Sequence, residues 1–228
     1  ITAGKTENQV ALKIFVDADH PVVHVTGESA NPVTVTAKVE SWRTEPQKVS
    51  QESTWTLAGG PGEIIQSADV FPDAEENSVR WYHRNETAKA FEETIRVQSL
   101  GPIRDTLRDP LLHRTFGGWL TGEGFKPVDK RTLATPSAVG SFALLMASTC
   151  EQTPTADDWL NLAEKTAARS ADPAAALART SQWWRAFWQL SWVSCDAGPS
   201  VEVPENAHPI RIGMDASGGS RFKGTIGA

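Results

Sequence analysis

Residues 10–42 alternate apolar and polar side chains, and this period of two is the strongest constraint on the fold. The alternation runs through VALKIFVDA (10–18), HPVVHVTGE (20–28) and PVTVTAKVESW (32–42). Turn-forming Asp, Pro, Gly and Asn residues separate the three stretches. The third stretch places its apolar residues on one face: Val33, Val35, Ala37 and Val39. Short alternating strands with such turns are typical of an antiparallel sandwich, whose sheets have one buried face and one wet face.

Further strand-like stretches continue this pattern as far as residue 148. They lie at residues 63–71, 78–83, 116–120 and 137–148. The most apolar of them contains FALLMA (142–147), which fits one buried strand. The polar stretch 43–54 and the Gly- and Lys-rich stretch 121–131 are predicted as connections, and residues 91–106 show no clear period.

From residue 153 the spacing of apolar residues becomes helical. Thr155 fits a helix N-cap because Asp158 follows three residues later. Pro173 fits the first position of a second helix, where its missing N–H costs nothing. The sequence therefore predicts two helices, at about residues 156–169 and 173–192.

The second predicted helix carries an unusual density of tryptophan. The stretch TSQWWRAFWQLSW (180–192) holds four of the nine tryptophans in the chain. At 100° per residue its bulky side chains cover roughly 200° of the helix, whereas an ordinary surface helix needs an apolar stripe of about 100°. These side chains are Trp183, Trp184, Phe187, Trp188, Leu190 and Trp192. The width of the arc favours a helix packed between two bodies; a sugar-stacking platform and a homo-oligomer seam are the alternatives.

Composition excludes some classes of function. The formal net charge of -6 argues against a nucleic-acid partner, which would favour a basic surface. No apolar run approaches the ~20 residues of a membrane span. Cys150 and Cys195 are the only cysteines; their spacing suits no zinc site, and unpaired thiols are favoured over a disulfide. The five histidines show no metal-ligand spacing, so the sequence implies no metal and no cofactor.

Four stretches together resemble a known family. FVDADHPVVHVTGES, WYHRNET (81–87), DPLLHRTFGGW (109–119) and the terminal WWRAFWQLSW resemble large bacterial glycoside hydrolases of the family-95-like type. The resemblance covers roughly residues 1–193. It implies an N-terminal β-supersandwich joined by a helical linker to a catalytic (α/α)6 barrel.

The tail resembles a different fold. PIRIGMDASGGSRFKGTIG (209–227) is similar to one hairpin of a laminin-G or concanavalin-A-like jelly roll, with DASGGS as its loop. The two resemblances imply a supersandwich at 1–152, a helical linker at 153–193 and a jelly-roll fragment at 194–228. The expected fold class is mainly β, with two C-terminal helices and a partial jelly roll. Because the barrel and most of the jelly roll are missing, we expect the chain to be part of a longer polypeptide.

Glycoside hydrolysis needs two carboxylates across the bond that is cleaved. The close pairs are Asp17/Asp19, Glu92/Glu93, Asp105/Asp109 and Asp157/Asp158. The first pair frames a turn, the second would point to opposite faces of a strand, and the last lies in the first turn of a helix. There is also no Gly-x-Ser-x-Gly elbow, which argues against a serine hydrolase. The sequence therefore assigns no catalytic residue.

The candidate substrate-binding residues lie in two of the resembling stretches. They are Trp81, His83, Arg84, Asn85, His113 and Arg114. On a strand, Trp81, His83 and Asn85 share one face, and Tyr82, Arg84 and Glu86 share the other. Aromatic, amide and cationic groups together are typical of a sugar site. The alternative, which the sequence leaves open, is that these side chains only hold neighbouring loops in place.

The best functional interpretation follows from the resemblance. It implies the non-catalytic N-terminal portion of a carbohydrate-active enzyme, a glycoside hydrolase of complex polysaccharides, secreted or periplasmic in a bacterium. The expected partners are a polysaccharide or oligosaccharide and a helical catalytic domain packed on the tryptophan helix. The alternatives are a stand-alone carbohydrate-binding module, an accessory domain of a polysaccharide lyase, and a purely structural domain.

Overall fold

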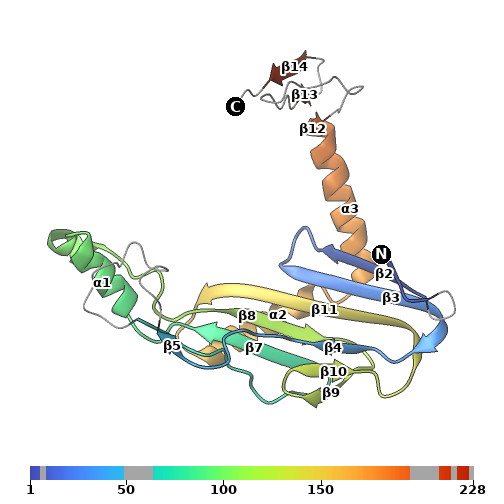
Figure 1. Cartoon of the computed structure of the whole chain (residues 1–228), viewed down its shortest axis with the longest axis horizontal. Helices are drawn as coiled ribbons and strands as arrows, with labels where there is room; N and C mark the ends of the chain where they lie inside the picture. The colour runs from blue at the N-terminus through green and yellow to red at the C-terminus, as the bar shows by residue number, and fades with distance from the viewer. Residues whose placement is uncertain (6–8, 49–63, 196–210, 217–219, 226–228) are drawn as a thin grey trace, which may run out of the picture. The chain divides into compact units, whose positions relative to one another are not determined.

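The computed structural model describes residues 1–5, 9–48, 64–195, 211–216 and 220–225. It divides the chain into two compact units, Ile1–Pro173 and Ala174–Ala228. The fold is mainly β, with antiparallel sheets and C-terminal helices, which confirms the predicted fold class (Figure 1). The first predicted helix lies in the larger unit, and the predicted domain boundaries at residues 152 and 193 stay predictions.

A six-stranded antiparallel sheet forms the frame of the first unit. Its order is β1 (Thr2–Ala3), β2 (Val10–Val16), β3 (Val22–Val33), β11 (Val139–Gln152), β8 (Arg114–Thr121) and β7 (Ser78–Arg84). The two longest strands, β3 and β11, pair at the centre, where Ala147 lies opposite Val22. The strands predicted from alternation near residues 10, 20, 78, 116 and 137 are therefore confirmed, although β3 and β11 extend further than predicted.

Smaller sheets complete the β structure of this unit. β4 (Thr36–Lys38), β10 (Thr132–Ala134) and β9 (Lys126–Asp129) form a three-stranded sheet, and β5 (Gln47–Lys48) pairs with β6 (Ile65–Gln66). The prediction of residues 121–131 as a connection was wrong for β9. A four-residue strand offers too few alternations to be recognised, and this one contains Pro127, which disfavours a strand assignment.

Residues from both faces of the six-stranded sheet contribute to core clusters. On one face, α2 (Ala156–Arg169) contacts β8 and β11 and completes a core cluster. Its members are Val22, Trp119, Ala147, Trp159, Ala163 and Ala167. On the other face, β9 and β10 contact β7 around a second cluster of Val79, Phe125, Leu133 and Leu144. Neighbouring residues serve opposite faces: Trp119 belongs to the first cluster, whereas Leu120 packs against the second.

The helix α2 begins and ends at side chains that fix it. Thr155 and Asp158 form the predicted capping box, since Asp158 N donates to Thr155 Oγ1 at 3.1 Å and Thr155 N donates to Asp158 Oδ2 at 3.1 Å. At the other end, the buried Ser170 hydroxyl lies 2.5 Å from Asp17 Oδ2 and 2.9 Å from His24 Nε2. This buried polar contact ties the C-terminal end of α2 to the sheet.

Neither α1 (Lys89–Val97) nor the short 3₁₀ helix Gly101–Thr106 was predicted from the sequence. The residue before α1 is Ala88, which makes no side-chain cap, so the usual start signal is missing. Glu92 and Glu93 therefore lie on a helix, and their predicted placement on a strand was wrong. Glu93 pairs with Arg96, and Glu92 pairs with Arg104.

The second unit contains most of α3 (Pro173–Leu190) and a three-stranded antiparallel sheet of β12 (Ser191–Cys195), β13 (Arg211–Ala216) and β14 (Ser220–Thr225). The predicted hairpin is confirmed as the β13–β14 pair, and most of its loop, 217–219, lies outside the described residues. Two details of the prediction were wrong. The helix ends at Leu190, so Trp192 lies on β12, and β12 adds a third strand to the hairpin.

Candidate functional site

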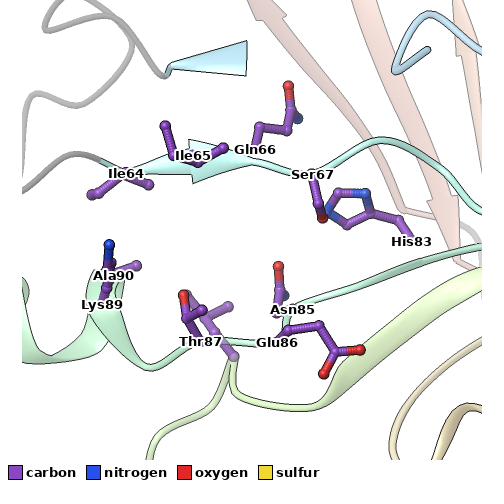
Figure 2. A pocket seen from close by; sticks show the side chains of 11 residues that line it. Ile64, Ile65, Gln66, Ser67, His83, Asn85, Glu86, Thr87, Lys89 and Ala90 are labelled. Atoms are coloured by element: carbon purple, nitrogen blue, oxygen red, sulfur yellow. The ribbon is translucent and has the colours of Figure 1, made fainter. Parts of the chain in front are cut away.

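A pocket of about 380 Å³ lies at the end of β7 (Figure 2). Its walls are β6 with the residues on either side of it, the turn that follows β7, and the start of α1. The lining residues are Ile64, Ile65, Gln66, Ser67, His83, Asn85, Glu86, Thr87, Lys89, Ala90 and Leu111. We call this cavity the β7 pocket.

Backbone hydrogen bonds hold the chain that leaves β7. Asn85 N donates to Arg114 O at 3.1 Å, and His113 N donates to Asn85 O at 2.7 Å. His113 has a positive φ of 62°, a conformation that few non-glycine residues adopt and that the two bonds help to maintain. The loop that carries Asn85 is therefore joined directly to the turn before β8.

The structure brings two of the six predicted site residues together in the β7 pocket, His83 and Asn85. Trp81 is on the same face of β7 but packs on the neighbouring strand. Its ring lies over Gly118, where an added Cβ would come within 2.4 Å of the ring. Trp81 therefore fills space between strands rather than lining the pocket.

Arg84 points away from the β7 pocket, as the alternation of strand side chains requires. Its guanidinium donates to the backbone oxygens of His113, Thr153 and Pro154 at 2.9–3.1 Å and to the hydroxyl of Thr115 at 2.7 Å. Its Nε lies 3.2 Å from the Glu86 carboxylate. These partners hold the ends of β7, β8 and β11 together, which favours the structural interpretation of Arg84.

His113 and Arg114 also lie outside the pocket lining. The His113 side chain is exposed, and the Arg114 guanidinium donates to Pro110 O at 2.7 Å. Arg114 also lies 3.8 Å from the sulfur of Cys150, which is an exposed free thiol. Whether Cys150 pairs with Cys195 stays a prediction, as does ligand binding by His113 and Arg114.

Sequence reasoning missed a buried polar network behind the pocket. The Asp69 carboxylate, 3% exposed, accepts hydrogen bonds from Arg43 Nε at 2.6 Å and Ser41 Oγ at 2.5 Å. His83 Nδ1 lies 3.2 Å from the same Asp69 oxygen that Arg43 contacts. Asp69 is separated from Ser41 and Arg43 by more than 25 residues of sequence, so no local pattern could have joined them.

The network shifts the pKa of two of its members. Burial alone would raise the pKa of Asp69, but the hydrogen bonds from Arg43 and Ser41 and the charge of Arg43 bring it below its ordinary value. Burial, and then the charge of Arg43, lower the pKa of His83, against a smaller opposing effect of Asp69. At neutral pH the network therefore contains an ionised Asp69 and an uncharged His83.

Comparison with known proteins places the chain in a family. Residues 1–193 match the N-terminal family DUF5703_N, described as Domain of unknown function (DUF5703). The chain belongs to this family. No curated protein matches the chain. The family description names no activity, so the resemblance to glycoside hydrolases and to a jelly roll stays a prediction.

In this DUF5703 N-terminal domain, the β7 pocket offers hydrogen-bonding groups and an apolar wall. The polar groups are two amides, two hydroxyls, an imidazole, an ammonium and a carboxylate. Glu86 is the only carboxylate among these described lining residues, whereas glycoside hydrolysis uses a pair. The part of the chain that the structure describes also contains no His, Cys, Asp and Glu cluster suited to a metal ion.

The matched region also includes α3, which carries an exposed aromatic surface. Trp183, Trp184, Phe187 and Trp188 are 39–50% exposed, and we call these four residues the α3 aromatic surface. Trp183 stacks on Phe187 with 5.5 Å between ring centroids, and Trp184 stacks on Trp188 at 6.1 Å. Within the described residues, no helix is long and apolar enough to cross a membrane.

Proposed function

We propose that this chain is the non-catalytic N-terminal portion of a secreted or periplasmic carbohydrate-active enzyme, and that its β7 pocket helps to bind a polysaccharide or oligosaccharide. The observation that carries the proposal is the pocket itself, which brings His83 and Asn85 beside Gln66, Ser67, Thr87 and Lys89. In small-ligand sites a few converging polar groups fix the orientation of the ligand, and the apolar part of the wall provides contact area.

The pocket supports binding better than chemistry. Sugars present many hydroxyl groups, which the amide, hydroxyl and imidazole groups can pair with, and they present apolar C–H faces. The side chains of Ile64, Ile65, Ala90 and Leu111 supply an apolar wall for those faces. Hydrolysis of a glycosidic bond requires a pair of carboxylates, and on this proposal both come from another domain.

Glycan binding by the purified chain tests this proposal. We expect the chain to bind to immobilised glycans on an array and to release no reducing sugar from them, because binding and hydrolysis belong to different domains. Asn85→Ala should weaken the affinity about tenfold in calorimetry, which corresponds to one hydrogen bond. The control is Asn31→Ala, which removes an exposed amide of β3 outside the β7 pocket. An array without binding, or equal effects of the two variants, would contradict the proposal.

The second part of the proposal concerns the partner of α3. A helical catalytic domain packs on the α3 aromatic surface. Burying one large apolar side chain contributes about 2–3 kcal/mol. Covering these four partly exposed rings with a second domain would therefore contribute substantially to the free energy of association. The match to the N-terminal family ends at residue 193, three residues after α3, so this surface lies at the boundary where a following domain would start.

Hydrogen exchange distinguishes a covered surface from an open one. The full-length protein encoded by the gene is compared with the present chain by mass spectrometry. Peptides from the second half of α3 should exchange about tenfold more slowly in the full-length protein, because packing adds stability to that part of the helix. Peptides from α2 serve as the control, since Trp159 and Ala163 are already buried. Equal exchange of α3 in the two proteins would contradict the predicted interface.

A further inference from the structure

The contact between His83 and Asp69 determines which ring nitrogen of His83 carries the proton. An ionised carboxylate can only accept hydrogen bonds, and the Asp69 oxygen concerned already accepts one from Arg43. The nitrogen that faces it, Nδ1, must therefore be the donor. In the uncharged ring the other nitrogen, Nε2, then has no proton and is a hydrogen-bond acceptor.

The orientation of this ring is fixed on several sides. Asp69 is held by Ser41 and Arg43, and its backbone N donates to Arg43 O at 2.8 Å. The His83 ring also contacts Phe116, with 5.1 Å between ring centroids. Because Asp69 cannot rotate without losing these bonds, it acts as a positioning residue for the imidazole.

The edge of the ring away from Asp69 is the part that is available to the β7 pocket. Asp69 does not line the pocket, whereas His83 does. In Figure 2, His83 lies at one end of the cavity, beside Ser67. The His83 side chain is 7% exposed, and within the described part of the chain its Nε2 has no hydrogen-bond partner. Nε2 is therefore the ring nitrogen that is left to pair with a bound molecule.

We infer that His83 Nε2 accepts a hydrogen bond from a hydroxyl group of an uncharged sugar bound in the β7 pocket, with Asp69 fixing the tautomer. This rests on the proposed function and names its ligand class. The lining residues include one cation, Lys89, and one anion, Glu86, so their formal charges cancel when His83 is uncharged. An unprotonated nitrogen also repels the lone pairs of a carboxylate, which disfavours a uronic acid at this position.

The inference carries a direction of pH dependence. Protonation of Nε2 converts the acceptor into a donor, so affinity should be complete above the pKa of His83 and lost as the pH falls through it. The charged groups around His83 are Asp69 and Arg43 in the network and Glu86 and Lys89 in the pocket. Since the pKa of His83 lies below its ordinary value, the loss should begin only below neutral pH.

Nitrogen-15 NMR of the labelled chain tests the tautomer without any ligand. At about pH 7, long-range proton–nitrogen correlation should show His83 protonated at Nδ1 and unprotonated at Nε2. Methyl glycosides of glucose, galactose and mannose are then added, and glucuronic and galacturonic acids serve as charged probes. A neutral glycoside should shift the Nε2 resonance, and its affinity should be lost in step with protonation of His83, which the same spectra follow as the pH is lowered from about 7. Near-ultraviolet circular dichroism checks that the fold persists at the lower pH.

Two variants complete the experiment. His83→Phe should weaken binding of the neutral glycoside about tenfold, as expected for loss of one hydrogen bond. His20→Ala removes a histidine that does not line the pocket and should leave affinity unchanged. A proton on Nε2 at neutral pH overturns the inference even if His83→Phe fails to fold. If a sugar binds but its affinity is independent of pH and the Nε2 resonance does not move, the inference about His83 is wrong and the proposed function stands. If no sugar binds, both the inference and the proposed function are wrong.

Discussion

Replacing Arg84 with alanine is expected to lower the free energy of unfolding by about 3 kcal/mol or more. The side chain is 5% exposed, and its guanidinium satisfies the backbone oxygens of His113, Thr153 and Pro154. The variant removes the Arg84 donor from Thr153 O and Pro154 O, whereas His113 O keeps the Thr115 hydroxyl. Each buried group that loses its partner costs about 1–3 kcal/mol. Urea denaturation followed by tryptophan fluorescence measures the change.

The stability and the glycan affinity of this variant together decide between the two interpretations of Arg84 that the sequence left open. Glu86→Gln is the control, because the Glu86 side chain is 64% exposed and a surface ion pair contributes at most about 1 kcal/mol. If Arg84 has a structural role, Arg84→Ala is much less stable than Glu86→Gln. If Arg84→Ala instead keeps its stability and loses glycan affinity, the side chain binds ligand and the structural assignment is wrong.

Features of this fold with a local cause could be predicted from the sequence. Strand β2 alternates over seven residues, and its neighbour β3 begins after a turn marked by Asp17, Asp19 and Pro21. The start of helix α2 is predicted by Thr155 and Asp158, which are three residues apart and form hydrogen bonds with each other. In each case the signal and the structure lie within one turn or one strand, so no knowledge of the tertiary fold was needed.

Features caused by contacts distant in sequence could not be predicted. The pattern of β7 correctly separates His83 from Arg84, but it does not say which face meets a pocket and which meets α2. That depends on Ile64 to Ser67, which form one wall, and on Thr153 and Pro154, which accept the Arg84 bonds. The role of Asp69 could not be predicted either, because its three side-chain partners come from two other segments of the chain.

The tryptophan content of the chain divides into rings that stabilise the fold and rings that remain exposed. Trp159 is fully buried in the cluster between α2 and the sheet, and it contacts Tyr82 with 5.9 Å between ring centroids. Trp159→Ala is expected to cost about 3–5 kcal/mol, the usual range for removing a buried aromatic side chain. Thermal and urea denaturation of the purified variant measure this loss.

Two further variants separate the causes of that loss. Trp42→Ala removes a ring that is 79% exposed and should cost less than about 1 kcal/mol, since its contact is with the Arg43 guanidinium. Trp159→Phe should lie between the two. It leaves a smaller cavity than alanine, and it also removes the Trp159 indole N–H, which is buried without a partner among the described residues. If Trp159→Phe proves as destabilising as Trp159→Ala, that N–H does have a partner, and the polar contact rather than the filled volume fixes α2 on the sheet.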